Sequence, residues 1–312
     1  MPKTFVDKLI QNIKNKNSIL CVGLDPQIKY LPRILKQEFQ NAYPNKIEAA
    51  ARCILEFNQK VIDNIFDIAV CVKPQIAFYE QYGSFGLYAF EETIKYAQKK
   101  DLMVLADVKR GDGGDTALAY SNTYLGKIET LDQSSLESQL NVDAVTLNIS
   151  IGSACLDPFI EKIIENQKAV FAVVKTSFKP NSEIENFKLE NGQPVWEKIA
   201  EFVNQKGEEA IGEKGYQNLG AVIGATYPKE AKIARKLMPK TWFLVPGYGA
   251  QGAAAKDAVA GIDQNGRGVI VNSARGITAS FLNKDLKSDQ GFEKEIRKAA
   301  IASRNELNEA LK

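Results

Sequence analysis

Eight short apolar runs recur along the chain, and each has the length of a single β-strand. They occupy residues Ile19–Asp25, Ala69–Gln75, Leu102–Lys109, Ala144–Asn148, Ala169–Ser177, Ala221–Thr226, Trp242–Gly247 and Val269–Arg275. The stretches between them repeat apolar residues at helical spacing, as in Ala50–Asn64, Tyr88–Lys99, Trp196–Gln205 and Lys229–Leu237. Strands that alternate with helices predict a parallel sheet with right-handed crossovers.

Eight strand–helix units in one chain favour an α/β fold of the closed (β/α)8 TIM-barrel type over an open sheet. Two connections, Gln27–Ile47 and Phe178–Gly215, are longer than such a barrel needs, and their polar, partly helical composition predicts surface insertions. The tail from Leu282 to Lys312 is predicted to form the final barrel helix. Because no linker or second apolar core is evident, we expect residues 1–312 to form a single (β/α)8 catalytic domain with helical insertions.

Composition narrows the classes of function. The 312 residues carry a net charge of +2 and no basic run interleaved with aromatic residues, which argues against a nucleic-acid partner. No apolar stretch reaches the ~20 residues of a membrane span, and the N-terminus lacks the apolar core of a secretion signal. We therefore expect a cytoplasmic protein without nucleic-acid or membrane partners.

The titratable residues restrict the chemistry further. Four cysteines, Cys21, Cys53, Cys71 and Cys155, lie in or beside apolar runs with no CxxC pair, which predicts buried reduced thiols. Histidine is absent, which excludes imidazole bases and nearly every zinc site built from histidine. Acid–base work must therefore fall to Lys, Asp, Glu, Tyr or Cys.

Charged side chains collect where predicted strands end. The third run leads into Asp107-x-Lys109-x-x-Asp112, and alternation along a strand places Asp107 and Lys109 on one face. The first and second runs carry Asp25 and Lys73 near their ends. All carboxyl ends of a barrel open at the same mouth, where active sites of this fold lie. These five residues are therefore predicted to form one charge cluster, with a set of structural ion pairs as the alternative.

A second candidate site follows the seventh and eighth strands. The segment Val245-Pro246-Gly247-Tyr248-Gly249-Ala250-Gln251-Gly252 is rich in glycine, which lets backbone N–H groups point at an anion. The eighth strand ends in Arg275, whose planar guanidinium matches phosphate oxygens. Because the loops after these two strands form the usual phosphate cradle of the fold, a phosphate site is predicted here.

Taken together, these residues resemble the orotidine 5'-phosphate decarboxylase family, in its longer form with insertions. The matching motifs run in the family's order between residues 18 and 280. They are Gly23-Leu24-Asp25-Pro26, Val72-Lys73-Pro74, Asp107-x-Lys109-x-x-Asp112 with Thr116, Lys175-Thr176-Ser177, the Gln251 loop and Asn272-Ser273-Ala274-Arg275. The Asp-x-Lys-x-x-Asp motif alone is shared with related sugar-phosphate barrels, whereas its combination with Lys73 and the Gln251 loop is specific.

The resemblance implies that the chain decarboxylates orotidine 5'-monophosphate to uridine 5'-monophosphate, the last step of de novo pyrimidine synthesis. It implies a reaction without cofactor or metal, in which Lys109 stabilises the C6 carbanion and donates a proton to it. Asp107, Asp112 and Lys73 would complete the charge network. No cofactor fingerprint is present in the sequence. The implied substrate-binding residues are Asp25 at the ribose, Thr176 and Ser177 at the pyrimidine, and Gln251 and Arg275 at the phosphate. Thr116 and Ala274 are further implied substrate-binding residues.

The resemblance also implies an assembly. The enzyme would be a homodimer whose active site is shared across the interface, with Asp112 and Thr116 reaching in from the other subunit. One position departs from the family pattern, because Gly113 stands where the family usually carries a bulky aliphatic residue. This departure concerns the apolar wall beside the pyrimidine and leaves the charge cluster intact.

Three alternatives remain open on the sequence alone. A related metal-dependent sugar-phosphate decarboxylase or synthase barrel would use the carboxylates as metal ligands, although the two lysines of the cluster would compete with a divalent ion. A nucleotide-binding barrel that has lost catalysis would not need Lys109 and both aspartates. A Schiff-base aldolase would use Lys175, which also ends a predicted inner strand.

Overall fold

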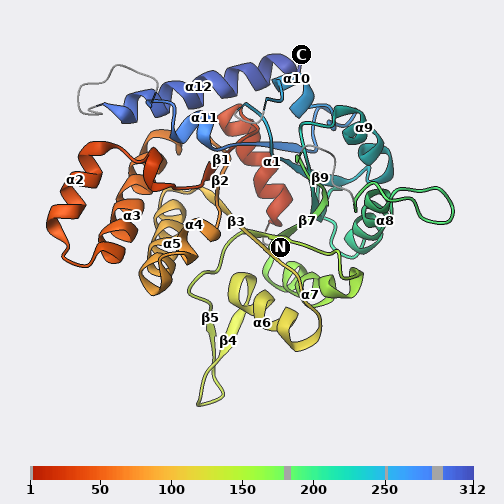
Figure 1. Cartoon of the computed structure of the whole chain (residues 1–312). Coiled ribbons are helices and arrows are strands. Elements are labelled where there is room, and N and C mark those ends of the chain that lie inside the picture. Colours follow the sequence, from red (N-terminus) through yellow and green to blue (C-terminus); the bar gives the residue numbers. More distant parts are fainter. Residues whose placement is uncertain (1–2, 179–183, 250–251, 283–290) are drawn as a thin grey trace.

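Eight parallel strands close into a barrel in the computed structural model, which describes residues 3–178, 184–249, 252–282 and 291–312 (Figure 1). Around the barrel the strands follow the order β1-β10-β9-β8-β7-β6-β3-β2. Their bounds are β1 Leu20–Leu24, β2 Cys71–Pro74, β3 Met103–Arg110, β6 Ala144–Leu147, β7 Ala169–Lys175, β8 Gln217–Ile223, β9 Thr241–Val245 and β10 Val269–Ser273. The α/β fold of the (β/α)8 type and all eight predicted strands are confirmed, although β8 begins at Gln217, before the predicted Ala221.

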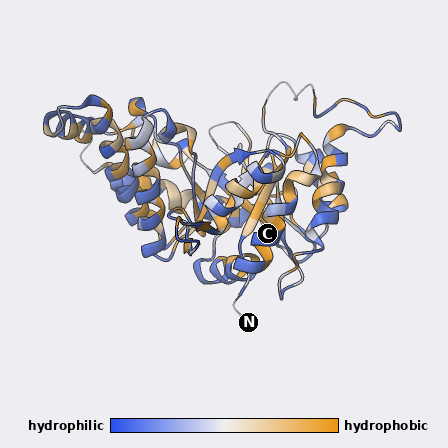
Figure 2. Cartoon of the chain, turned by 90° about the horizontal axis from the view of Figure 1, so that it is seen from below, coloured by the Kyte–Doolittle hydropathy of each residue, from blue (hydrophilic) through white to orange (hydrophobic). Residues whose placement is uncertain are grey.

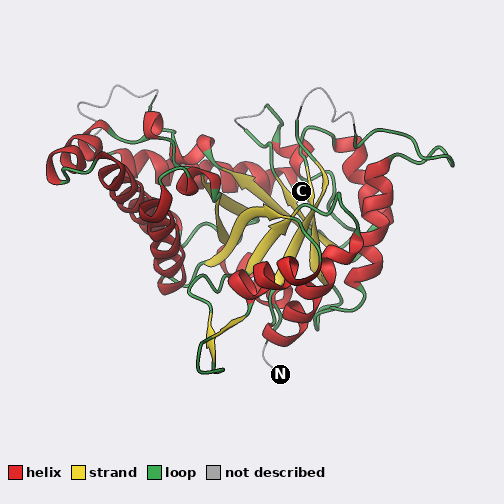
Figure 3. Cartoon of the chain, turned by 60° about the horizontal axis from the view of Figure 1, so that its bottom comes forward, coloured by secondary structure: helices red, strands yellow, loops and turns green. Residues whose placement is uncertain are grey.

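Helices surround the barrel on its outside (Figure 3). They are α2 Arg33–Ala42, α3 Lys46–Ile65, α4 Ala77–Glu80, α5 Gly83–Lys99, α6 Gly114–Leu125, α7 Asp157–Asn166, α8 Val195–Gly207, α9 Pro228–Leu237, α10 Ala255–Ala258, α11 Arg275–Thr278 and α12 Phe292–Ala310, with the 3-10 helices η1 Ile28–Tyr30 and η2 Ser153–Leu156. Each of the four predicted helices is confirmed within a longer one. For example, α3 begins at Lys46 because the side chain of Asn45 accepts hydrogen bonds from the N–H groups of Ile47 and Glu48.

Both predicted insertions contain a helix. In the first, α2 packs against α3 and lies with it on one side of the molecule (Figure 1). The second insertion contains α8, and its residues 179–183 lie outside the described residues. The predicted C-terminal helix is confirmed as α12, which packs on α3 through stacked rings of Phe57 and Phe292 at 6.0 Å.

One helix that the sequence analysis did not predict, α1 (Phe5–Lys16), closes one end of the barrel. Its buried Phe5 and Leu9 join a cluster of interior side chains, and the Phe5 ring meets Phe171 edge-on at 6.0 Å. Burial of each such side chain contributes about 1.5–3 kcal/mol. Because the cluster includes Ala144 and Ala169, which begin their strands, α1 seals the amino-terminal end. The barrel strands are coloured mostly as hydrophobic in Figure 2.

The sequence analysis also did not predict a two-stranded antiparallel hairpin. Its strands, β4 (Lys127–Glu129) and β5 (Ser135–Glu137), are short and exposed. The hairpin projects from the barrel in Figures 1 and 3. Exposed strands of this kind lack the apolar run that marked the barrel strands.

The cysteines behave as small apolar side chains. All four are free and buried, as predicted. Cys21 of β1 and Cys71 of β2 are register partners in the barrel interior, and burial raises the pKa of the Cys21 thiol. Among the described residues, no helix combines the length and the apolar character that crossing a membrane requires.

Candidate active site

Four charged side chains from three neighbouring strand ends meet at the carboxyl end of the barrel. Lys73 Nζ of β2 lies 2.7 Å from Asp107 Oδ2 and 3.8 Å from Asp25 Oδ1. Lys109 Nζ lies 2.5 Å from the other carboxylate oxygen of Asp107, Oδ1. Asp25 directly follows β1, and Asp107 and Lys109 lie near the end of β3. The structure thus brings together Asp25, Lys73, Asp107 and Lys109, which we call the charge cluster.

A bulge in β3 shapes the backbone beneath the charge cluster. The register between β3 and β6 shifts in this stretch, and Lys109 has a φ of 43°, in the left-handed region. Thr146 of β6 provides the acceptor that these backbone N–H groups need. Its Oγ1 accepts hydrogen bonds from the N–H groups of Val108 and Lys109 at 3.0 Å each. The same hydroxyl donates to Asp107 Oδ1 at 2.9 Å. Left-handed backbone at a residue other than glycine costs about 1–3 kcal/mol, which these hydrogen bonds help to offset.

Asp107 and Lys73 each stabilise the charged form of the other. Burial alone would raise the pKa of Asp107, but the positive charges and hydrogen bonds of Lys73 and Lys109 hold this pKa well below its usual range. Burial alone would lower the pKa of Lys73, but attraction to Asp107 and Asp25 raises it instead. The Lys73 and Asp107 side chains are 6% and 8% exposed, whereas that of Lys109 is 45% exposed. Lys109 is therefore the cation of the charge cluster that faces solvent.

Asp25 carries a buried oxygen without a donor. Its Oδ1 accepts no hydrogen bond from any described residue, although Lys73 Nζ lies 3.8 Å away. Burial raises the pKa of Asp25, and the nearby positive charges counteract this only in part. Gly23 lets the ends of β1 and β10 approach each other, because a Cβ at position 23 would lie 2.7 Å from the Cβ of Ala274. A ligand hydroxyl at Asp25 would relieve the uncompensated burial of this oxygen.

Asp112 and Thr116 do not join the charge cluster within one chain. Asp112 is exposed, and its Oδ1 accepts a hydrogen bond from the Gly113 N–H at 2.8 Å. Within the described part of the chain, no ion pair connects Asp112 to a lysine. Thr116 is exposed in the first turn of α6. At Gly113 the single chain leaves open space, because a Cβ there would meet nothing within 4 Å.

The residues predicted at the pyrimidine lie directly after β7. The Thr176 N–H donates to Glu185 Oε1 at 3.0 Å, while Thr176 Oγ1 is buried and has no hydrogen-bond partner among the described residues. The Ser177 carbonyl accepts a hydrogen bond from Thr226 Oγ1 at 3.1 Å. The backbone of this segment is therefore fixed by side chains from two other parts of the chain.

The residues predicted at the phosphate follow β9 and β10. Arg275 is exposed at the start of α11, next to the half-buried Ala274. Gly247 and Gly249 have φ values of 102° and 73°, which glycine adopts without strain. Gln251 lies outside the described residues. The nearby Arg275 guanidinium lowers the pKa of Tyr30 in η1, so the first insertion lies close to this end of the site.

Comparison with known proteins identifies the arrangement. A family model described as Orotidine 5'-phosphate decarboxylase / HUMPS family matches residues 18–285. The chain belongs to this family. Orotidine 5'-phosphate decarboxylase of Clostridium perfringens (strain 13 / Type A) is 36% identical over 305 residues, 98% of each chain. The enzyme of the same name from Rhodopirellula baltica is 35% identical over 312 residues, 99% of each chain. The resemblance seen in the sequence motifs is confirmed.

Two solved structures superpose on nearly the whole chain. Leishmania donovani OMP decarboxylase superposes with a TM-score of 0.69 and 28% identity, covering 97% of this chain and 99% of that chain. Leishmania donovani UMP synthase superposes with a TM-score of 0.70 and 29% identity, and there the match covers 57% of that chain. The chain is therefore an enzyme, a decarboxylase of orotidine 5'-phosphate in pyrimidine biosynthesis.

The environment of Lys175 does not suit the Schiff-base chemistry of an aldolase. Its side chain is fully buried, and its Nζ lies 2.7 Å from Asn186 Oδ1 and 3.2 Å from Glu185 Oε2. A Schiff base requires a neutral amine that reaches the substrate carbonyl. An enclosed ammonium paired with Glu185 meets neither requirement.

The donor set also fits a metal poorly. Among the described residues, no group of three or more Cys, Asp and Glu side chains is arranged to hold a metal ion. Both oxygens of Asp107 are already engaged by lysines, and Oδ1 also accepts from Thr146. A divalent cation would have to displace these donors.

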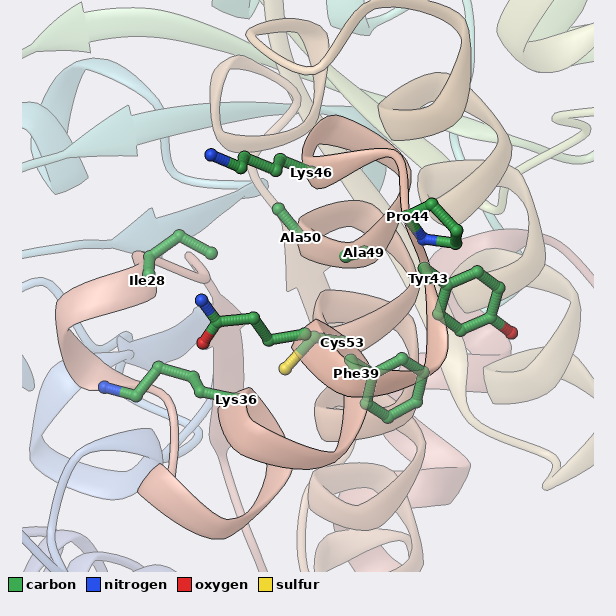
Figure 4. A pocket seen from close by; sticks show the side chains of 10 residues that line it. Ile28, Lys36, Phe39, Tyr43, Pro44, Lys46, Ala49, Ala50 and Cys53 are labelled. Atoms are coloured by element: carbon green, nitrogen blue, oxygen red, sulfur yellow. The ribbon is translucent and has the colours of Figure 1, made fainter.

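A hollow elsewhere on the molecule is distinct from the charge cluster. A pocket of about 480 Å³ lies between α2 and α3 (Figure 4). Its ten lining residues, among them Phe39, Tyr43 and Cys53, include no member of the charge cluster. This pocket is therefore not where the family's chemistry takes place.

Two residues that shape the site escaped the sequence analysis. Thr146 lies between apolar neighbours in β6. It is two residues after the inward-facing Ala144, so the signal that could have found it was a polar residue on the inward face of this strand. Glu185 lies in an insertion without periodicity, so no sequence signal pointed to its contact with Thr176.

Proposed function

We propose that the charge cluster removes carbon dioxide from C6 of orotidine 5'-monophosphate without a cofactor or metal and yields uridine 5'-monophosphate. The contrast between the two lysines supports this most directly. Lys73 is buried behind Asp107, whereas Lys109 is 45% exposed and held 2.5 Å from the same carboxylate. An ammonium fixed in this way suits a reaction in which negative charge develops on a substrate atom.

The reaction proceeds by heterolysis of the bond between C6 and the carboxylate. Carbon dioxide leaves, and the electron pair of the broken bond stays on C6. The Lys109 ammonium stabilises this pair by its charge and transfers a proton to C6, which forms the C6–H bond of the product. The resulting neutral amine regains a proton from solvent.

Asp107 and Lys73 prepare Lys109 for this role. Asp107 orients the ammonium and places negative charge beside the substrate carboxylate, which disfavours the ground state. Lys73 compensates Asp107 from the buried side, so the carboxylate stays ionised when substrate excludes water.

Substrate contacts follow from the strand ends around the charge cluster. A ribose hydroxyl that donates to Asp25 Oδ1 satisfies the buried oxygen that lacks a donor. The remaining contacts in this proposal are Thr176 and Ser177 with the pyrimidine, and Gln251 and Arg275 with the phosphate. Ala274 is a further substrate-binding residue. Binding energy from the phosphate favours closure and desolvation at the reacting carbon.

The active unit in this proposal is a homodimer of one-domain subunits. Asp112 is an exposed carboxylate that no lysine of its own chain pairs with among the described residues, and Thr116 is exposed beside it. A second copy that presents both residues to Lys109 and Lys73 extends the alternation of charge. The seal that α1 forms and the packing of α12 on α3 support a single catalytic domain over residues 1–312 in this proposal.

Incubation of chelator-treated protein with orotidine 5'-monophosphate tests the proposed function. The ultraviolet spectrum should change from that of orotidylate to that of uridylate at a rate unaffected by EDTA. Absence of turnover contradicts the proposal, and activity that returns only with added magnesium supports the metal-dependent alternative.

A further inference from the structure

We infer that Lys175 and Glu185 are positioning residues that hold residues 176–178, here called the base loop, at the pyrimidine end of the site. The inference rests on the proposed function, which places Thr176 and Ser177 against the pyrimidine. It assigns a role to a buried lysine and to an insertion residue that the reaction itself does not use.

Lys175 ends β7 with an enclosed positive charge. Its side chain is 0% exposed, and its Nζ contacts Asn186 Oδ1 at 2.7 Å and Glu185 Oε2 at 3.2 Å. The same Nζ lies 5.3 Å from the centre of the Tyr227 ring. A buried ammonium requires such partners, so Lys175 draws the segment around residue 185 onto the end of the strand.

Glu185 carries this constraint to the base loop. One carboxylate oxygen, Oε2, faces Lys175, while Oε1 accepts the N–H of Thr176 at 3.0 Å. A hydrogen bond to an ionised carboxylate is roughly twice as strong as one between neutral groups. The position of Thr176 therefore depends on where Lys175 holds Glu185.

The segment between β8 and α9 fixes the rest of the base loop. Thr226 Oγ1 donates to the Ser177 carbonyl at 3.1 Å, and the Tyr227 hydroxyl donates to the Phe178 carbonyl at 2.5 Å. Gly224 permits this contact, because a Cβ there would lie 2.7 Å from the Ser177 backbone nitrogen. Backbone groups of three consecutive residues are thus held by side chains from both flanks.

This arrangement leaves a polar side chain available for a ligand. Thr176 Oγ1 is buried and accepts or donates no hydrogen bond within the described residues. A hydroxyl of this kind can both donate and accept, which matches the alternating C=O and N–H groups of a pyrimidine edge. A fixed base loop should therefore strengthen binding of the pyrimidine, while other residues bind the phosphate.

Binding of two probes separates this role from a merely structural one. In the Glu185→Ala variant, the affinity for uridine 5'-monophosphate should fall about tenfold, the loss expected for one charge-assisted hydrogen bond. The affinity for ribose 5-phosphate, which lacks the base, should stay unchanged. KM for orotidine 5'-monophosphate should rise more than kcat falls.

Two further variants test the role of the Glu185 charge and provide a control away from the base loop. Glu185→Gln keeps an acceptor for the Thr176 N–H but lacks the charge that pairs with Lys175, so it should restore only part of the lost affinity. Glu165→Ala removes a carboxylate that pairs with Lys162 at 2.9 Å away from the base loop, and it should bind both probes as the unmodified protein does.

These binding experiments can contradict the positioning role without contradicting the proposed decarboxylation. Equal losses for both probes, or no loss in Glu185→Ala, would overturn the positioning role even if the unmodified enzyme is active. If Glu185→Ala does not fold, Tyr227→Phe decides, because it removes only the hydroxyl that holds Phe178. It should weaken uridylate binding and spare ribose 5-phosphate, and unchanged uridylate binding contradicts the inference. Failure of the unmodified protein to decarboxylate its substrate instead refutes the proposed function.

Discussion

Thr146 donates its hydroxyl hydrogen to the carboxylate of Asp107 at 2.9 Å. The oxygen of that hydroxyl also accepts the N–H groups of Val108 and Lys109. One side chain therefore sets both the position of the acid and the backbone of the lysine beside it. The left-handed φ of Lys109 makes this support necessary, since the neighbouring strand offers no regular ladder there.

Replacement of Thr146 by valine should slow turnover strongly. Thr146→Val keeps the shape but leaves two buried N–H groups without an acceptor, which destabilises the fold by about 1–3 kcal/mol. A shift of Lys109 by about 1 Å should lower kcat by about 100-fold. Thr146→Ser keeps the hydroxyl and should retain most of kcat. Steady-state kinetics and urea unfolding measure both effects, and a normal kcat in the valine variant contradicts the account.

The pKa shifts of Asp107 and Lys73 predict how stability depends on pH. The pKa of Asp107 is lowered, so its contribution is fully present above the unfolded value of about 3.9 and is lost as pH falls through the folded pKa. The pKa of Lys73 is raised, so its contribution is fully present below about 10.4 and is lost as pH rises through the folded pKa. Both contributions therefore persist from about pH 5 to pH 9.

The Asp107→Asn variant tests this linkage. It leaves the buried charge of Lys73 without its nearest partner, so the free energy of unfolding should fall by about 3 kcal/mol at neutral pH. The difference from the unmodified protein should narrow only as the pH falls below about 4, where the unfolded Asp107 becomes protonated. Asp63→Asn, at an exposed pair with Lys100, should change stability by less than about 1 kcal/mol. A difference that stays constant across the acid range rules out the charge of Asp107 as its source.

Arg275 should matter only for phosphorylated substrate. Arg275→Ala should lower kcat/KM for orotidine 5'-monophosphate by about 10- to 100-fold, as expected for lost hydrogen bonds to a charged group. Slow turnover of the nucleoside orotidine should not change. Arg267→Ala is the matched control, because Arg267 is exposed just before β10, whereas Arg275 follows that strand. Unchanged kinetics with the nucleotide would remove Arg275 from the phosphate site.

A shared active site predicts complementation between inactive variants. Lys109→Ala and Asp112→Ala should each be inactive alone, but mixed dimers should contain one intact site, giving about a quarter of the unmodified activity after random assembly. Lys109→Ala mixed with Asp107→Ala should give no recovery, because both residues come from the same subunit. Absence of recovery in the first mixture contradicts a site that takes Asp112 from the partner.

The barrel could be predicted because its strands are marked by strong local patterns. Each strand is an apolar run, and charged residues at the ends of β2 and β3 stand out against it. Alternation along β3 also places Asp107 beside Lys109, and their side chains meet. These relationships depend on residues close in the sequence or on the common mouth of the fold.

Other features depend on contacts that local patterns do not encode. The role of α1 arises from packing of Phe5 against Phe171, far along the chain. The role of Thr146 depends on a bulge in a different strand. Glu185 meets Thr176 only because an insertion folds back over a strand end. Each of these contacts is set by tertiary structure, which the sequence pattern does not reveal.

The most direct test concerns the proton donor itself. Lys109→Ala should lower the rate of orotidylate loss by about 10,000-fold, because it removes both the stabilising charge and the proton. Its affinity for uridine 5'-monophosphate, measured by calorimetric titration, should remain measurable. Lys127→Ala, which removes an exposed lysine paired with Glu137, should keep full activity. A Lys109→Ala enzyme that still turns over its substrate at the original rate contradicts the account.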